Sequence, residues 1–76
     1  MGEPSKPGGY LYNELLARVV HTNQELMRVV DELSVAETER ARSRLLIHAA
    51  LQVAEQRDAL AQIREIWSAY RGRSFA

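Results

Sequence analysis

Two seven-residue hydrophobic repeats run along this 76-residue chain, and they do not share a register. The phase slips by one residue within the polar stretch between Ser34 and Arg44. Repeats of this length are typical of helices that pack side by side through an apolar stripe. The slip therefore indicates two helices. The first repeat consists of Tyr12, Val19, Leu26 and Leu33, and the second of Leu46, Val53, Leu60 and Trp67.

The spacing of apolar residues predicts a first helix over about 10–33 and a second over about 35–71. No glycine or proline interrupts the chain between Tyr10 and Arg71, so nothing local breaks either helix. We expect residues 1–9, which are rich in glycine and proline, to form a flexible tail. Gly72 suits the position just after a helix, so residues 72–76 are expected to be a second tail.

The expected fold is all-α, a two-helix antiparallel hairpin that is coiled-coil-like and assembles into a larger helical bundle. Ser34-Val35-Ala36-Glu37 matches a capping box, which predicts that Ser34 caps the second helix and places the turn there. The alternative is one long coiled-coil helix in which the slip is a local distortion. Good helix formers between Glu37 and Arg44 keep this alternative open.

A hairpin folded about Ser34 brings together residues whose numbers sum to roughly 69, which sets Tyr10 beside Ala59. The rest of the second helix then overhangs, and this part is apolar. We expect it to be a protein interface, because clustered exposed apolar groups mark contact surfaces. The alternative is a bend near 55–58 that folds the end back. The predicted interface residues are Leu60, Ile63, Ile66, Trp67 and Tyr70, and the predicted core residues are Val19, Leu26, Val29, Leu33, Leu46 and Val53.

No residue pattern predicts an enzyme, so we expect no catalytic, cofactor-binding or metal site and no small-molecule substrate. His21 and His48 are the only histidines, and the chain has no cysteine, whereas a metal needs three or four convergent ligands. The carboxylates are spread along helix faces beside arginines, at ordinary helix-pair spacing. There is no glycine-rich phosphate loop and no nucleophile beside a base.

The formal net charge is zero, which argues against a nucleic-acid partner. The alternative function is nevertheless a small dimeric nucleic-acid-binding regulator that contacts phosphate through two arginine clusters. Acidic neighbours such as Glu37 and Glu39 offset the first cluster. The possible phosphate contacts are Arg40, Arg42, Arg44, Arg71 and Arg73.

The preferred interpretation is a small helical protein–protein interaction or assembly module of a bacterium or phage. It would be an oligomeric subunit, an adaptor or a small inhibitor that acts through an apolar helix face. Its partner is expected to be a second copy of itself or another protein, and no association with a membrane is expected. We expect a cytoplasmic location, because the chain shows no signal peptide and no cysteine. The two-helix plan resembles that of WXG-type secreted hairpins, but the Trp-x-Gly turn is absent and no family is assigned.

Overall fold

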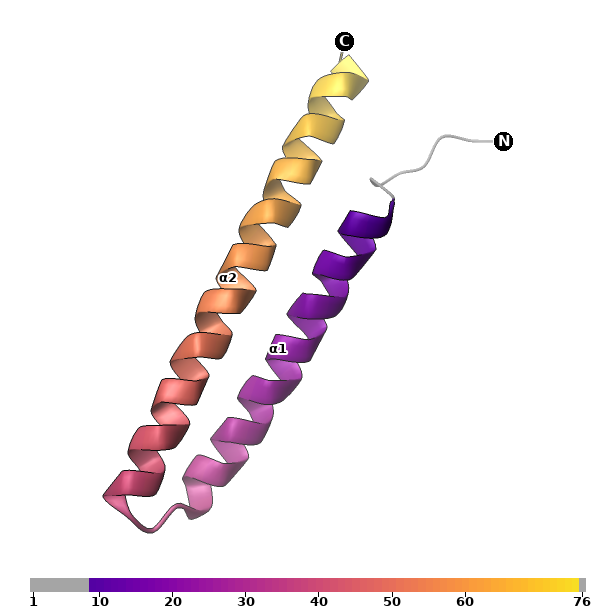
Figure 1. Cartoon of the computed structure of the whole chain (residues 1–76). Coiled ribbons are helices and arrows are strands. Elements are labelled where there is room, and N and C mark those ends of the chain that lie inside the picture. Colours follow the sequence, from indigo (N-terminus) through magenta and orange to yellow (C-terminus); the bar gives the residue numbers. More distant parts are fainter. Residues whose placement is uncertain (1–8, 76) are drawn as a thin grey trace.

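The computed structural model describes residues 9–75, with side chains as far as Arg71. It contains helix α1, Tyr10–Val35, and helix α2, Glu39–Phe75, joined by a short turn at residues 36–38. The two helices run antiparallel and form a hairpin 57 Å long (Figure 1). The prediction of an all-α helical hairpin is therefore confirmed, and the alternative of one long helix is wrong. The predicted N-terminal tail lies outside the described residues, apart from Gly9.

The start of α1 depends on the backbone of Gly9. Its φ of 118° lies in a region that side chains with a Cβ disfavour, so glycine suits this position. The Gly9 carbonyl accepts a hydrogen bond of 3.2 Å from the backbone N–H of Asn13, which closes the first turn. Among the described residues, no side-chain hydrogen bond caps this end of the helix. The last residue of the glycine-rich segment thus acts as the N-cap of α1.

The turn lies later in the chain than the capping-box pattern predicts. Ser34 is still part of α1, and its hydroxyl donates to the Asp31 carbonyl at 2.6 Å. The N-cap of α2 is Thr38, whose hydroxyl oxygen accepts from the backbone N–H of Ala41 at 3.0 Å. Glu39 in the first turn of α2 adds a favourable interaction with the helix dipole. The prediction that Ser34 caps α2 is wrong, because its side chain already has a partner within α1.

The far end of α2 also differs from the expectation. The helix continues to Phe75, so Gly72 lies within it instead of ending it after Arg71. A glycine inside a helix costs only about 1 kcal/mol, which does not by itself stop a helix. α2 is continuous through 55–58, so the alternative of a bend that folds its end back is wrong.

Each helix packs on the other through one row of residues, which we call the inner row. In α1 its members recur at alternating spacings of three and four, as in a coiled coil. In α2 the spacing includes two successive steps of four, from His48 to Gln52 to Gln56. The inner row of α1 is Tyr12, Leu15, Val19, Thr22, Leu26, Val29 and Leu33, and that of α2 is Leu45, His48, Gln52, Gln56, Ala59, Ile63, Ile66 and Tyr70, all buried or half-buried.

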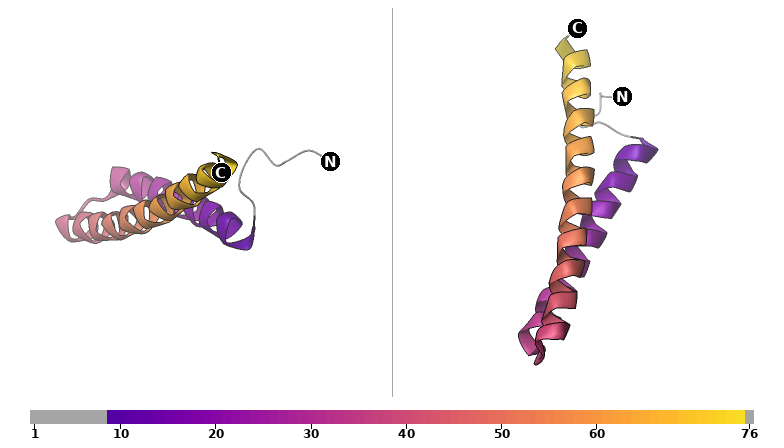
Figure 2. Two further views of the ribbon diagram at one scale, coloured as in Figure 1. Left: turned by 90° about the horizontal axis from the view of Figure 1, so that it is seen from above. Right: turned by 60° about the vertical axis from the view of Figure 1, so that its left-hand side comes forward.

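The helices diverge from the turn towards the Tyr10 end (Figures 1 and 2). Side-chain size follows this divergence. Ala59, which is fully buried, lies in the middle of α2, whereas Tyr12, Trp67 and Tyr70 lie at the wide end. Large aromatic rings therefore fill the space that the separating backbones leave open.

Two of the predicted core residues do not lie in the core. Leu46 is 58% exposed and Val53 is 40% exposed, whereas Val29 is fully buried and Val19, Leu26 and Leu33 are half-buried as inner-row residues. The second hydrophobic repeat lies one residue after the inner row of α2, which is a rotation of about 100° around the helix. α2 therefore turns a row with three polar residues towards α1 and leaves Leu46, Val53 and Leu60 of its more regular apolar repeat uncovered.

Candidate interaction surface

The predicted interface residues at the end of α2 take part in the hairpin itself. The Nε1 atom of Trp67 donates a hydrogen bond of 3.1 Å to the hydroxyl of Tyr12, and the two rings meet edge to face with centroids 6.3 Å apart. Tyr70 packs edge to face on Trp67 at 5.8 Å. Ile63 and Ile66 are half-buried, and Leu60 is 47% exposed. The premise that Trp67 lies beyond the reach of the first helix is wrong.

The position of the turn explains this difference. A turn at residues 36–38 instead of Ser34 changes which residues lie at the same level of the two helices. Glu25 lies opposite His48, and Tyr12 opposite Trp67. The overhang of α2 therefore begins near Trp67 and not after Ala59. An interface role for Leu60, Ile63, Ile66, Trp67 and Tyr70 remains a prediction.

A larger uncovered apolar surface lies along the middle of the hairpin. On both helices it is the central part of the row that follows the inner row by one residue. Its seven large aliphatic side chains are between 38% and 63% exposed. We call this surface the apolar face, and it consists of Leu16, Val20, Asn23, Met27 and Val30 on α1 and Leu46, Ala49, Val53, Arg57 and Leu60 on α2.

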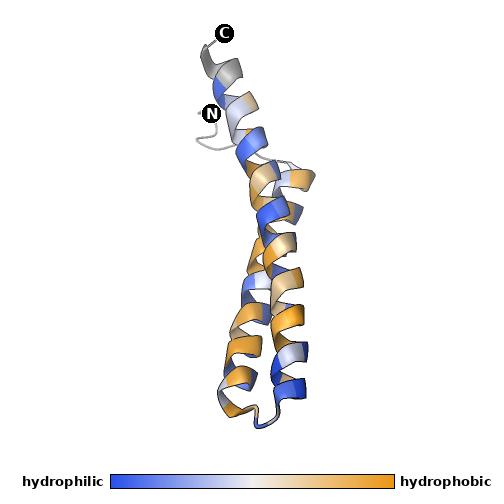
Figure 3. Cartoon of the chain, turned by 90° about the vertical axis from the view of Figure 1, so that its left-hand side faces the viewer, coloured by the Kyte–Doolittle hydropathy of each residue, from blue (hydrophilic) through white to orange (hydrophobic). Residues whose placement is uncertain are grey.

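The two halves of the apolar face lie on the same side of the hairpin. Both helices are right-handed and they run in opposite directions, so a step of one residue from each inner row turns both helices towards the same side. Colouring by hydropathy shows apolar segments along both helices from the turn upwards (Figure 3). The hairpin therefore has one apolar side that spans both helices.

The opposite side of α1 is charged. From Glu14 to Glu32, the row that precedes the inner row by one residue consists of ionisable side chains, and only its first member, Leu11, is apolar. Arg28 contacts both Glu25 at 2.7 Å and Glu32 at 2.6 Å. Because these pairs are exposed, each contributes little to the stability of the hairpin. The charged row is Glu14, Arg18, His21, Glu25, Arg28 and Glu32.

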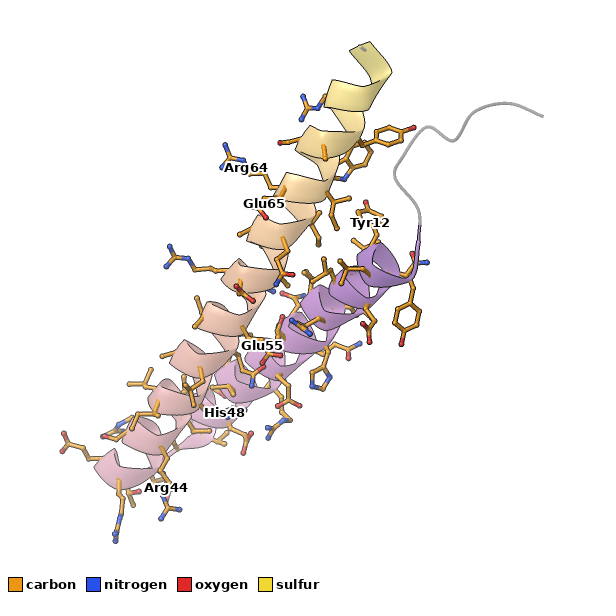
Figure 4. The ribbon with its side chains drawn as sticks, turned by 45° about the horizontal axis from the view of Figure 1, so that its top comes forward. Tyr12, Arg44, His48, Glu55, Arg64 and Glu65 are labelled. Carbon is orange, nitrogen blue, oxygen red and sulfur yellow. The ribbon has the colours of Figure 1, made fainter. Side chains whose placement is uncertain are left out.

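One contact from the charged row crosses to the other helix. The Nε2 atom of His48 lies 3.4 Å from the Glu25 carboxylate, and His48 is directed from α2 towards α1 (Figure 4). Hydrogen bonds from Arg28 and then from His48 lower the pKa of Glu25 below its usual value. The ionised Glu25 carboxylate thus connects the charged row of α1 to His48 on α2.

The contact between the helices is unusually polar at its centre. Thr22 is fully buried, and its hydroxyl lies 3.0 Å from the carbonyls of Arg18 and Val19 in its own helix. Within the described part of the chain, the side-chain oxygen of Gln52 is buried without a hydrogen-bond partner. A buried unpaired carbonyl oxygen destabilises a fold. The hairpin therefore encloses polar groups while apolar side chains of both helices face outwards.

The described residues offer little that supports other chemistry. No three His, Asp or Glu side chains among them converge to hold a metal ion. A shallow depression on α2 is lined by Ala61, Arg64, Glu65 and Ser68, all from one helix face that is open to solvent. Neither helix, over the part of the chain described, is long and apolar enough to cross a membrane.

The arginine clusters do not form one surface. Arg40, Arg42 and Arg44 follow each other at two-residue steps, so Arg42 points away from the other two around α2. Arg44 lies near the turn end of the hairpin (Figure 4), whereas Arg71 lies near the other end, about 40 Å further along the helix. The side chain of Arg73 lies outside the described residues. Among the arginines whose side chains are described, Arg40, Arg42, Arg44 and Arg71 therefore form no continuous basic patch.

No protein-family model, curated protein sequence or solved structure matches this chain. The apolar face was not anticipated from the sequence as a surface shared by both helices. A second series at alternating steps of four and three was nevertheless present one residue after the first. It comprises Leu16, Val20, Asn23, Met27 and Val30.

Proposed function

We propose that this chain is a protein–protein interaction or assembly module that acts through its apolar face. The observation that carries the proposal is the outward position of seven aliphatic side chains from both helices, on one side of the hairpin. Surfaces of this kind mark contact sites, because water-exposed apolar area is unfavourable. The helical pattern fits docking of an amphipathic helix pair against another helical surface.

The distribution of polar residues supports the same proposal. A hairpin that folded only for itself would place its most apolar rows between its helices. Here the row between the helices includes Thr22, His48 and Gln52, whereas Leu46, Val53 and Leu60 lie outside. The sequence thus carries more apolar surface than two helices alone bury, as expected for part of a larger bundle.

A pair of matched substitutions tests the proposal. The purified chain is expected either to associate, as measured by light scattering, or to bind a hydrophobic fluorescent dye as a monomer. Leu60→Glu, on the apolar face, should abolish whichever of the two behaviours is found. Leu51→Glu should retain it, because Leu51 is 63% exposed but lies on the other side of α2. A cooperatively melting monomer that binds no dye would contradict the proposal.

A further inference from the structure

We infer that the occupant of the apolar face is a second copy of this chain, and this inference rests on the proposed function. The two hairpins pack face to face about a two-fold axis that crosses the face at the level of Asn23 and Val53. The product is a four-helix bundle in which the two turns lie at opposite ends. In this bundle α1 packs on α1 of the second copy, and α2 packs on α2.

The size of the apolar face suits a dimer of this kind. With side chains 38–63% exposed, its seven aliphatic residues leave on the order of 700 Å² of surface open per chain, close to the roughly 800 Å² per partner of a standard stable interface. A patch of this size also exceeds the area that most soluble monomers leave exposed. Face-to-face docking covers the whole patch without any change in the hairpin.

The apolar face is symmetric along the helix direction. Leu16 and Val30 each lie seven residues from Asn23, and Leu46 and Leu60 each lie seven residues from Val53. A two-fold axis perpendicular to the helices reverses their direction. It therefore places Leu16 against Val30 of the second copy, and Leu46 against Leu60. This reciprocity is what an isologous interface requires.

Both centres of symmetry lie at nearly the same level of the hairpin. The cross-helix contacts place Glu25 opposite His48 and Tyr12 opposite Trp67, with residue numbers that sum to 73 and 79. Asn23 and Val53 sum to 76, between these values. One axis can therefore pass through the centre of the face on both helices.

The polar residues of the face favour this arrangement over the other possible docking. With the turns at opposite ends, Asn23 meets Asn23 of the second copy, and each amide has both a donor and an acceptor to offer. With the turns at the same end, Asn23 would instead be buried against Val53 and lose its partner. A paired asparagine in an apolar seam is also a known means of fixing register and orientation.

The remaining polar member of the face is accommodated in the same way. Arg57 lies four residues after Val53, and Ala49 lies four residues before it. The two-fold axis therefore places Arg57 against Ala49 of the second copy. The small alanine leaves room for the aliphatic stem of Arg57, and the guanidinium extends to solvent at the edge of the bundle.

Single-cysteine variants test both the partner and its orientation, because the full chain contains no cysteine. Asn23→Cys and Val53→Cys each lie on the proposed axis, so each should link to itself under mild oxidation. The Leu51→Cys control lies on the other side of α2 and should link at least about tenfold more slowly, since its thiols meet only by collision. Sedimentation equilibrium of the unmodified protein should give twice the chain mass of 8.6 kDa.

Two results would overturn the inference. A molar mass of one chain at all concentrations tested would exclude the second copy. If that monomer still bound the hydrophobic dye through the apolar face, the proposed function would survive and only its occupant would change. A dimer in which Val53→Cys fails to link to itself, while a mixture of Leu16→Cys and Leu60→Cys chains links readily, would show the turns at the same end.

Discussion

The contact between Tyr12 and Trp67 gives a quantitative prediction about the open end of the hairpin. Tyr12 is only 7% exposed, and its hydroxyl accepts the hydrogen bond from Trp67. Tyr12→Phe removes that acceptor and should lower the free energy of unfolding by about 0.5–1.5 kcal/mol. The edge-to-face contact adds about 0.5–1.5 kcal/mol beyond the area it buries. A double-mutant cycle with Tyr12→Ala and Trp67→Ala should therefore show a coupling of about 1–2 kcal/mol.

The assay is urea unfolding of the unmodified protein, the two single alanine variants and the double variant. Unfolding is followed by far-UV circular dichroism at one fixed protein concentration. Fixing the concentration holds the contribution of association to the apparent stability constant for variants that associate equally. Tyr10→Ala is the matched control, because Tyr10 is 80% exposed and its hydroxyl donates a hydrogen bond to Glu14 of the same helix, at 3.4 Å. Tyr10→Ala should show no coupling to Trp67→Ala. A coupling near zero for Tyr12 as well would refute the reasoning and return Trp67 to the role of an interface residue alone.

Three further predictions concern the turn, the polar core and the response to pH. Thr38→Ala should lower the free energy of unfolding by about 1 kcal/mol because it removes the N-cap of α2, whereas Ser34→Ala should be neutral or slightly stabilising. Thermal melts distinguish the two variants, and the opposite order would contradict the observed turn. Gln52→Leu should raise stability by about 1 kcal/mol or more in the same melts, because it removes a buried oxygen without a partner; a loss would show that this oxygen is satisfied in solution. Because the pKa of Glu25 is lowered in the fold, its contribution is present above the unfolded carboxyl pKa and disappears as the pH falls through the lower folded value. Glu25→Gln should therefore weaken the dependence of the melting temperature on pH in this acidic range, and an unchanged acid profile would be evidence against the contact with Arg28 and His48.

The helical hairpin was predictable because its signals are local. Each signal can be read from a short stretch of sequence. The signals are the three-and-four spacing in α1, the absence of glycine and proline inside the helices up to Arg71, and the slip between the two repeats. These features led to two helices and to inner-row positions such as Val19, Val29 and Leu33. Residues of this kind are buried whichever rotation the second helix adopts, so the prediction for α1 did not depend on the details of the turn.

The turn and the rotation of α2 were not predictable in the same way. Ser34 and Thr38 both suit an N-cap, and choosing between them requires knowing which hydroxyl is already bonded within α1. A turn that comes later shifts the level of every cross-helix pair, which is why Trp67 reaches Tyr12. The rotation of α2 about its own axis is harder to predict than the turn, because either of two adjacent rows of α2 could face α1. One is the apolar repeat with Leu46, and the other contains polar residues such as Gln52.

The apolar face follows from that ambiguity. Pattern reasoning assumes that the most regular hydrophobic repeat faces the nearest helix in the same chain. When a chain buries surface against a second chain as well, each helix carries two apolar rows, and the sequence alone does not say which of them meets which neighbour. Asn23 illustrates the point. It is a polar residue of the apolar face, and it lies next to Thr22, which is a polar residue of the inner row.

The most direct test of the second copy is the dependence of the melting temperature on protein concentration. If a second chain covers the apolar face, folding is linked to association, and the melting temperature of the unmodified protein should rise steadily between about 1 and 100 μM. Leu60→Glu should flatten this dependence, and Leu51→Glu should leave it unchanged. A melting temperature that is the same at every concentration for the unmodified protein, with a cooperative transition, would contradict the account.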